Sequence, residues 1–191
     1  MGQFELYFQL GVNHILDMAG FDHILFVVVL CSLYPPGHWK MIVFLVTAFT
    51  IGHSVTLALA TLNLIRVNAS LVEFLIPLTI AITAISNILK PEIKNGFQLN
   101  YLFAFFFGLI HGLGFSNYLK ALLGNEISIL DPLFAFNIGL EAGQLVIVAS
   151  FLIFSILPLI WFKVKQRDWT MVISSIVLGV SLMMMIDTKF W

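Results

Sequence analysis

Imidazole and carboxylate side chains stand inside long apolar stretches of this sequence, where crossing a membrane needs no polar residue. Each ionisable group near the centre of a bilayer costs at least a few kcal/mol, so such residues are functional candidates by default. Histidine, aspartate and glutamate are also ligands of divalent transition metal ions such as Ni²⁺, Co²⁺ or Zn²⁺. The sequence therefore predicts a shared metal or proton site, whose candidate residues are His14, Asp22, His23, His53, His111 and Glu141.

Three of these histidines are predicted to lie at one depth. His23, His53 and His111 each lie about 11 to 13 residues from the expected cytoplasmic end of their helix, which is roughly 17 to 20 Å at 1.5 Å per residue. Counted from Asp131 at the outer end, Glu141 lies about 15 Å down and reaches a similar plane. We expect one site built from several helices.

Polar neighbours at helical spacing would support these candidate ligands. Thr56 shares a helix face with His53, and Asn137 and Gln144 flank Glu141 on one stripe. The expected supporting residues are Ser54, Thr56, Asn137 and Gln144. Beside His111, the four-residue spacing of Gly108 and Gly112 predicts close approach of a neighbouring backbone.

Glu73 begins a thinner polar stripe on another predicted helix. It has two interpretations: a functional carboxylate, or an acidic residue at the start of a helix near the outer interface. Its stripe continues through Thr79, Thr83 and Asn87.

The composition indicates that these residues belong to a membrane protein. The 191 residues are 60% hydrophobic and 10% charged, with a mean hydropathy of +1.03, which a water-soluble domain does not carry. Nine basic residues nearly balance ten acidic ones, which excludes an electrostatic nucleic-acid binder. Cys31 is the single cysteine, so no internal disulfide can form. Residues 1–191 are predicted to form one transmembrane domain.

Charge-free intervals of sufficient length predict an all-α polytopic membrane protein with about six transmembrane helices. The first is the least regular, because Asp17, Gly20 and Asp22 interrupt it, and its upstream part has the alternative of lying along the membrane interface. The expected spans are Gly11–Tyr34, Met41–Leu64, Leu71–Leu89, Leu99–Leu123, Pro132–Trp161 and Trp169–Ile186.

The basic residues predict the orientation, because cytoplasmic loops carry an excess of Lys and Arg. One side carries three, namely Arg66, Lys120 and Lys189. Both termini are therefore expected outside. The other side carries six: Lys40, Lys90, Lys94, Lys163, Lys165 and Arg167.

Four motifs resemble the HupE/UreJ family of small bacterial membrane proteins, in particular its second branch. Each motif contains a histidine or glutamate named above, and together they extend from the first span through the fifth. They read GVNHILDMAGFDHILF (11–26), FTIGHSVTL (49–57), FGLIHGLGF (107–115) and FNIGLEAGQL (136–145).

The resemblance implies an inner-membrane protein of six or seven spans, associated with hydrogenase and urease accessory genes, with members regarded as nickel or cobalt permeases. It carries over to Asp22, His23, His111 and Glu141 as functional positions. The chain departs from the permease pattern, since seven residues separate His14 from the Asp22-His23 pair.

Three functions remain open from the sequence. In a permease, His14 would collect an ion for the other histidines, and Asp22 and Glu141 would offset its charge. In an intramembrane zinc hydrolase acting on a lipid or lipid-linked substrate, Glu141 or Asp22 would be the general base and Ser54 would polarise a carbonyl. The third is a metal-binding accessory protein that does not transport. A homo-oligomer is one open assembly state.

Overall fold

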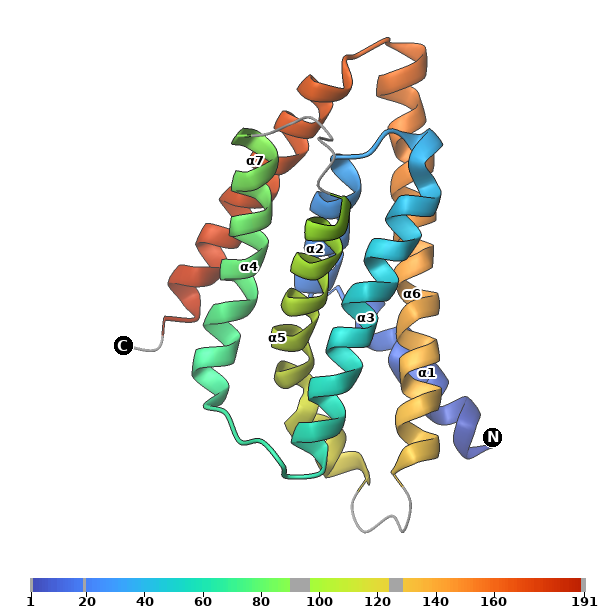
Figure 1. Ribbon diagram of the computed structural model, residues 1–191, viewed down its shortest axis with the longest axis vertical. Coiled ribbons are helices and arrows are strands. Elements are labelled where there is room, and N and C mark those ends of the chain that lie inside the picture. The colour runs from blue at the N-terminus through green and yellow to red at the C-terminus, as the bar shows by residue number, and fades with distance from the viewer. Residues whose placement is uncertain (1, 19, 90–96, 124–128, 190–191) are drawn as a thin grey trace.

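The computed structural model describes residues 2–18, 20–89, 97–123 and 129–189. Within these ranges the chain forms seven α-helices, so the predicted all-α class is confirmed. Five of the helices are long and apolar enough to cross a membrane, and Figure 1 shows them running along one common direction. They are α3 (Trp39–Thr61), α4 (Ala69–Leu89), α5 (Phe97–Leu123), α6 (Leu130–Ile156) and α7 (Gln166–Asp187).

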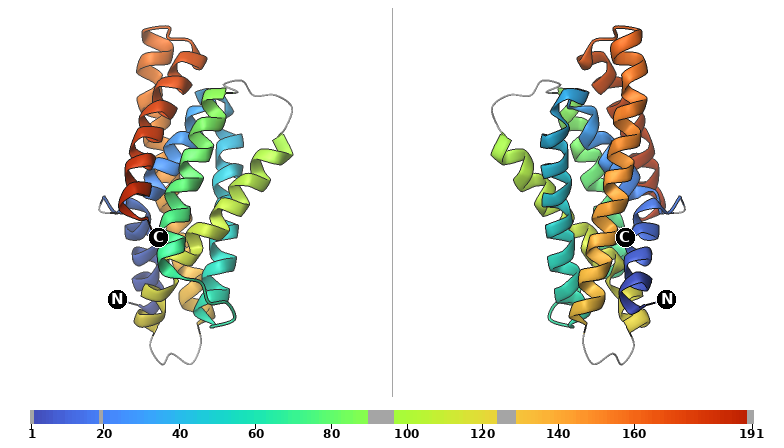
Figure 2. Two further views of the ribbon diagram at one scale, coloured as in Figure 1. Left: turned by 90° about the vertical axis from the view of Figure 1, so that its left-hand side faces the viewer. Right: turned by 90° about the vertical axis from the view of Figure 1, so that its right-hand side faces the viewer.

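The predicted first span is wrong as one continuous helix. The chain instead forms α1 (Gln3–Leu16) and α2 (Asp22–Ser32), which together take the place of a sixth span. Asp17 has an extended backbone, with φ −65° and ψ 116°, and this ends α1. The connection lies about midway along the bundle (Figure 2). A helix interrupted at mid-depth places helix ends and polar side chains inside the membrane, where discontinuous helices commonly form binding sites.

The upstream half of this interrupted span packs against α6. Tyr7, Gly11 and Ile15 are buried on α1. A Cβ added at Gly11 would collide with the carbonyl oxygen of Phe136, so the two helices touch at backbone level. This contact is not what a separate interfacial segment would make, and α1 belongs to the bundle.

A second backbone contact joins α3 to α5. Small residues allow such approach, and in lipid, where apolar surface gains nothing by leaving the solvent, van der Waals packing of this kind drives helix association. The close approach predicted beside His111 is confirmed. Added Cβ atoms at Gly52, Gly108 and Gly112 would meet the carbonyl oxygens of Phe105, Phe49 and His53 respectively.

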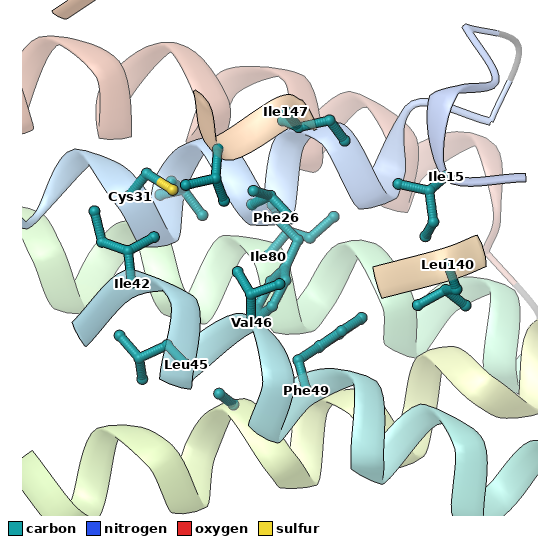
Figure 3. Close-up of a cluster of buried hydrophobic side chains, with 14 of the residues drawn as sticks. Ile15, Phe26, Cys31, Ile42, Leu45, Val46, Phe49, Ile80, Leu140 and Ile147 are labelled. Carbon is teal, nitrogen blue, oxygen red and sulfur yellow. The ribbon is translucent and has the colours of Figure 1, made fainter. Parts of the chain in front are cut away.

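The apolar core lies between these helices and α2. Figure 3 shows Cys31 and Ile42 at one end of the core and Ile15 and Leu140 at the other. Polar bonds hold the end of α2 to its neighbours, because its last carbonyls have no partner within the helix. The carbonyl oxygen of Ser32 accepts a bond of 2.6 Å from the Thr170 hydroxyl on α7.

The fifth predicted span, Pro132–Trp161, continues beyond α6 as a π-helical turn, Leu157–Trp161. Pro158 lies in this turn. Proline lacks the backbone donor that a regular α-helix would need there, and a wider turn accommodates it. The span thus ends where the sequence predicted.

The N-terminus lies toward one end of the bundle and the turn between α6 and α7 lies at the other, whereas α7 ends a little past the middle, on the side of the N-terminus (Figure 1). This turn carries Lys163 and Lys165, and α3 begins with Lys40 at the same end. Lys90 and Lys94, which also entered the orientation argument, lie outside the described residues.

We predict that the end of the bundle nearer the termini faces the outside of the cell. Alkaline phosphatase fused after residue 191 should be active, and fused within the turn at residues 163–165 it should be inactive. A green fluorescent protein series at the same sites is the matched control and should give the inverse pattern. Phosphatase activity only at the turn would reverse the orientation.

The backbone contact of α3 with α5 gives a stability prediction. Gly112→Ala should lower the midpoint of thermal unfolding in detergent, because overpacking against a fixed carbonyl costs about 1–3 kcal/mol. Gly179→Ala on α7 is the control, since no atom lies within 4 Å of its added Cβ. Because alanine has a higher helix propensity than glycine, the unfolding midpoint of that variant should be unchanged or slightly raised. Equal midpoints for the two variants would contradict the close approach.

Candidate metal centre

Four imidazoles from four helices come together in the middle of the bundle. The ring centre of His23 lies 4.7 Å from that of His14, 5.7 Å from that of His53 and 5.4 Å from that of His111. The common depth expected for three of these rings agrees with these distances. His14, expected in a permease to collect an ion for the other histidines, lies directly beside two of them, because the chain is interrupted after α1; its ring centre is 6.1 Å from that of His53. We call His14, His23, His53 and His111 the histidine cluster.

Neighbouring acceptors determine which nitrogen of two rings carries the proton. Nδ1 of His111 lies 2.9 Å from the carbonyl oxygen of Phe107, which only accepts hydrogen bonds. Nδ1 of His23 lies 3.2 Å from the Asp22 carboxylate. Both Nδ1 atoms therefore donate, and in the neutral form of each ring the lone pair is on Nε2. A histidine oriented in this way by a carboxylate or carbonyl is the usual arrangement of a metal-binding imidazole.

Five other ring nitrogens of the cluster are buried without partners among the described residues. His23, His53 and His111 are 4%, 0% and 1% exposed, and the Nε2 atoms of all four clustered rings lack a hydrogen bond among the described residues. His53 lacks one on Nδ1 as well. An unpaired buried polar group costs about 1–3 kcal/mol, so several together call for a physical explanation.

The imidazoles are close but do not yet converge on one point. Among the described residues, no three His, Cys, Asp or Glu side chains are arranged to hold a metal ion together. Their proximity is thus a property of the helix packing, and ligation would need the rings to turn.

A cavity of about 650 Å³ leads to the cluster from the side of the termini. His14, His23 and His111 line this cavity, whereas His53 is fully buried and does not line it. Three carboxylates also line this cavity, and two of them were not among the main candidates. They are Asp17, Asp22 and Glu73.

The opposite side of the cluster is closed by phenylalanines. Phe26, Phe49 and Phe107 each lie one helical turn beyond a clustered histidine of the same helix, in the direction away from the termini. The rings of Phe26 and Phe49 lie 4.7 Å apart and are both 1% exposed, and Figure 3 shows these two residues within the core. Phe26 lies 6.1 Å from Phe107. We call these three residues the phenylalanine layer.

Glu141 lies apart from the imidazole nitrogens. Its carboxylate accepts a hydrogen bond of 2.7 Å from the Thr47 hydroxyl. Thr47 is six residues before His53 on α3, about 9 Å along the helix axis. The amide oxygen of Gln144 accepts a bond of 2.6 Å from Thr50. The predicted stripe on α6 therefore faces α3, but through two threonines that sequence reasoning missed, although their three-residue spacing marks one helix face.

The other expected supporting residues have local roles. The Ser54 hydroxyl donates to the carbonyl oxygen of Thr50, and Thr56 donates to that of His53. Both bonds lie within α3, where a hydroxyl commonly bonds the preceding turn. The side-chain oxygen of Asn137 is buried and unpaired among the described residues.

The long apolar helices and their interior polar cluster define a polytopic helical membrane protein. A family model described as HupE / UreJ protein matches residues 1–189. The chain therefore belongs to the HupE/UreJ family. Neither the curated proteins nor the solved structures include a significant match to it.

The bond between Thr47 and Glu141 can be tested by a double-mutant cycle. Thr47→Val and Glu141→Ala each remove one partner of the bond and should each destabilise the protein, with a coupling energy of about 0.5–2 kcal/mol, the range of interhelical side-chain bonds in membranes. Unfolding by denaturant in micelles measures the four free energies. Thr47→Ser retains the hydroxyl and should stay close to the parent protein. Additive effects of the two changes would show that the bond is absent.

Proposed function

We propose that this protein binds a divalent transition metal ion at the histidine cluster and carries it across the bacterial inner membrane, as a nickel- or cobalt-type permease. The observation that carries the proposal is the set of buried, unpartnered Nε2 atoms on four neighbouring rings. A metal ion with open coordination positions would satisfy them, whereas lipid tails offer no hydrogen-bond or coordination partner.

The ring spacing supports a shared ion. For a metal about 2.0–2.1 Å from nitrogen, each ring centre lies about 3.2 Å from the ion, so two rings at a tetrahedral angle have centres about 5 Å apart. The three distances from His23 are 4.7, 5.7 and 5.4 Å. Rotation of the rings would turn the nitrogens inward without moving the helices.

The charges support a cation as the ligand. Imidazole suits nickel, cobalt, copper and zinc, and a carboxylate within reach offsets part of the charge. Asp22 lies in the first turn of α2, against His23 and 17% exposed, so it is held at the cluster rather than in bulk water. A site of this kind favours a divalent cation over an anion or a neutral solute.

A cavity on one side gives an ion access to the cluster. The cavity leads to the cluster from the side of the termini, and the phenylalanine layer closes the other side. A permease that alternates access would open this layer to release the ion toward Lys40 and the turn at residues 163–165. With both termini outside, as the basic residues predict, the net movement would be uptake.

The zinc hydrolase alternative needs a general base beside the bound ion. Glu141 is bonded to Thr47, Asp22 is bonded to His23, and Ser54 donates to its own helix. Glu141 and Ser54 are thus engaged away from the histidine cluster, and Asp22 orients His23, which favours transport. The accessory alternative would keep the binding step and lack the movement.

The proposal is tested by metal binding and uptake together. Protein purified without added metal should bind about one Ni²⁺ or Co²⁺ per chain by titration calorimetry and mass spectrometry. His23→Ala and His111→Ala should each weaken the affinity by at least about tenfold, as loss of a ligand or its support commonly does. His38→Ala is the control, because His38 lies in the short turn before α3, away from the cluster.

Cells that express the parent protein should accumulate radioactive nickel above cells that lack it, and His23→Ala should abolish the difference. Binding without accumulation would favour the accessory or hydrolase function. A parent protein that shows no metal binding and no accumulation would contradict a metal-related role for the cluster.

A further inference from the structure

The cavity that reaches the histidine cluster lies next to a second space near the end of the bundle that carries the termini. This second space, of about 280 Å³, lies between the α3–α4 connection and α5, and we call it the outer groove. Both spaces are lined by Glu73 of α4 and by Gly114 of α5. An ion entering through the outer groove would therefore pass Glu73 before it meets any imidazole.

The side chain of Glu73 is free to bind at this junction. It is exposed, and no hydrogen bond or ion pair engages it among the described residues. The inner end of the same cavity holds the buried, unpartnered Nε2 atoms of His23 and His111. The carboxylate and these nitrogens thus face one continuous space.

The charges that line the outer groove also favour a role for Glu73 in attracting a cation. Arg66 and Lys120 line it, and the Lys120 ammonium donates to the side-chain oxygen of Asn63 at 3.0 Å. Two positive charges at an entrance repel a divalent cation over several ångströms. Glu73 is the one carboxylate in the outer groove among the described residues, so it supplies the attraction there.

Gly114, which lines both spaces, allows close packing of α4 against α5. A Cβ added at this position would lie 3.0 Å from the terminal carbon of Ile76 on α4. Any larger side chain would collide with Ile76, which lines the cavity. The absence of a side chain at Gly114 thus lets α4 and α5 pack closely beside both spaces.

We propose that Glu73 forms an entry site for the divalent cation, which binds there first and then moves to the histidine cluster. This assignment rests on the proposed transport function. It makes Glu73 a determinant of how readily the protein captures its substrate at low concentration. It also assigns a role to a residue that the sequence left open between a functional carboxylate and a helix-start acid.

The test measures Ni²⁺ and, in parallel, Co²⁺ uptake over a range of concentrations, together with metal binding to the purified protein. Glu73→Gln should raise the half-saturating concentration for uptake by about tenfold, because a carboxylate partner is lost in a partly solvated site. The affinity of the purified protein should stay within about twofold, since the histidines remain. Glu73→Asp should recover part of the capture.

Glu5→Gln is the matched control, because Glu5 is an exposed acid of α1 that lines neither space. It should behave like the parent protein. Gly114→Val should also raise the half-saturating concentration, by narrowing the junction, provided that its circular dichroism and thermal midpoint show a folded chain.

Three results would overturn the assignment, and they are distinguishable. Unchanged uptake in Glu73→Gln would leave Glu73 as a surface acid at a helix start. Loss of metal from purified Glu73→Gln would place it within the histidine site instead of before it. A parent protein that neither binds nor accumulates metal would remove the proposed function itself, and the entry site with it.

Discussion

The direct contact between the backbones of α3 and α5 is the constraint on which the centre of this protein depends. Gly108 and Gly112 of α5 face the carbonyl oxygens of Phe49 and His53, so no side chain separates the two helices. His53 and His111 are therefore held at one level by atoms that cannot rotate away. In a bilayer, where apolar surface alone does not drive helices together, such close packing must supply the attachment.

The interruption of the first span brings the other two histidines, His14 and His23, close together. A continuous helix would have placed His14 and His23 nine residues apart along one axis, about 13 Å. The extended segment after Leu16 instead lets α1 follow α6 and lets α2 start again at mid-depth. The two rings thereby come within 4.7 Å of each other, with Asp22 beside them.

The surroundings of the cluster differ strongly on its two sides. Toward the termini lie carboxylates, a cavity and the outer groove, whereas the phenylalanine layer lies toward the opposite end. An unpartnered imidazole nitrogen costs free energy where water cannot reach it, as on the side of the phenylalanine layer. The cavity on the other side gives a ligand access to the cluster. This asymmetry is what a step of ion capture before release requires.

The sequence alone determined the helical membrane class, five of the six spans and the family, because long apolar intervals and four His- or Glu-containing motifs are local in the chain. It also determined that His23, His53 and His111 share a depth, since rise per residue converts counting into height. Only the tertiary structure decided that His14 joins them, that Glu141 turns to Thr47 and that Glu73 lines the cavity. Those outcomes depend on helix rotation and on a break in one helix, and neither follows from the spacing of residues within single spans.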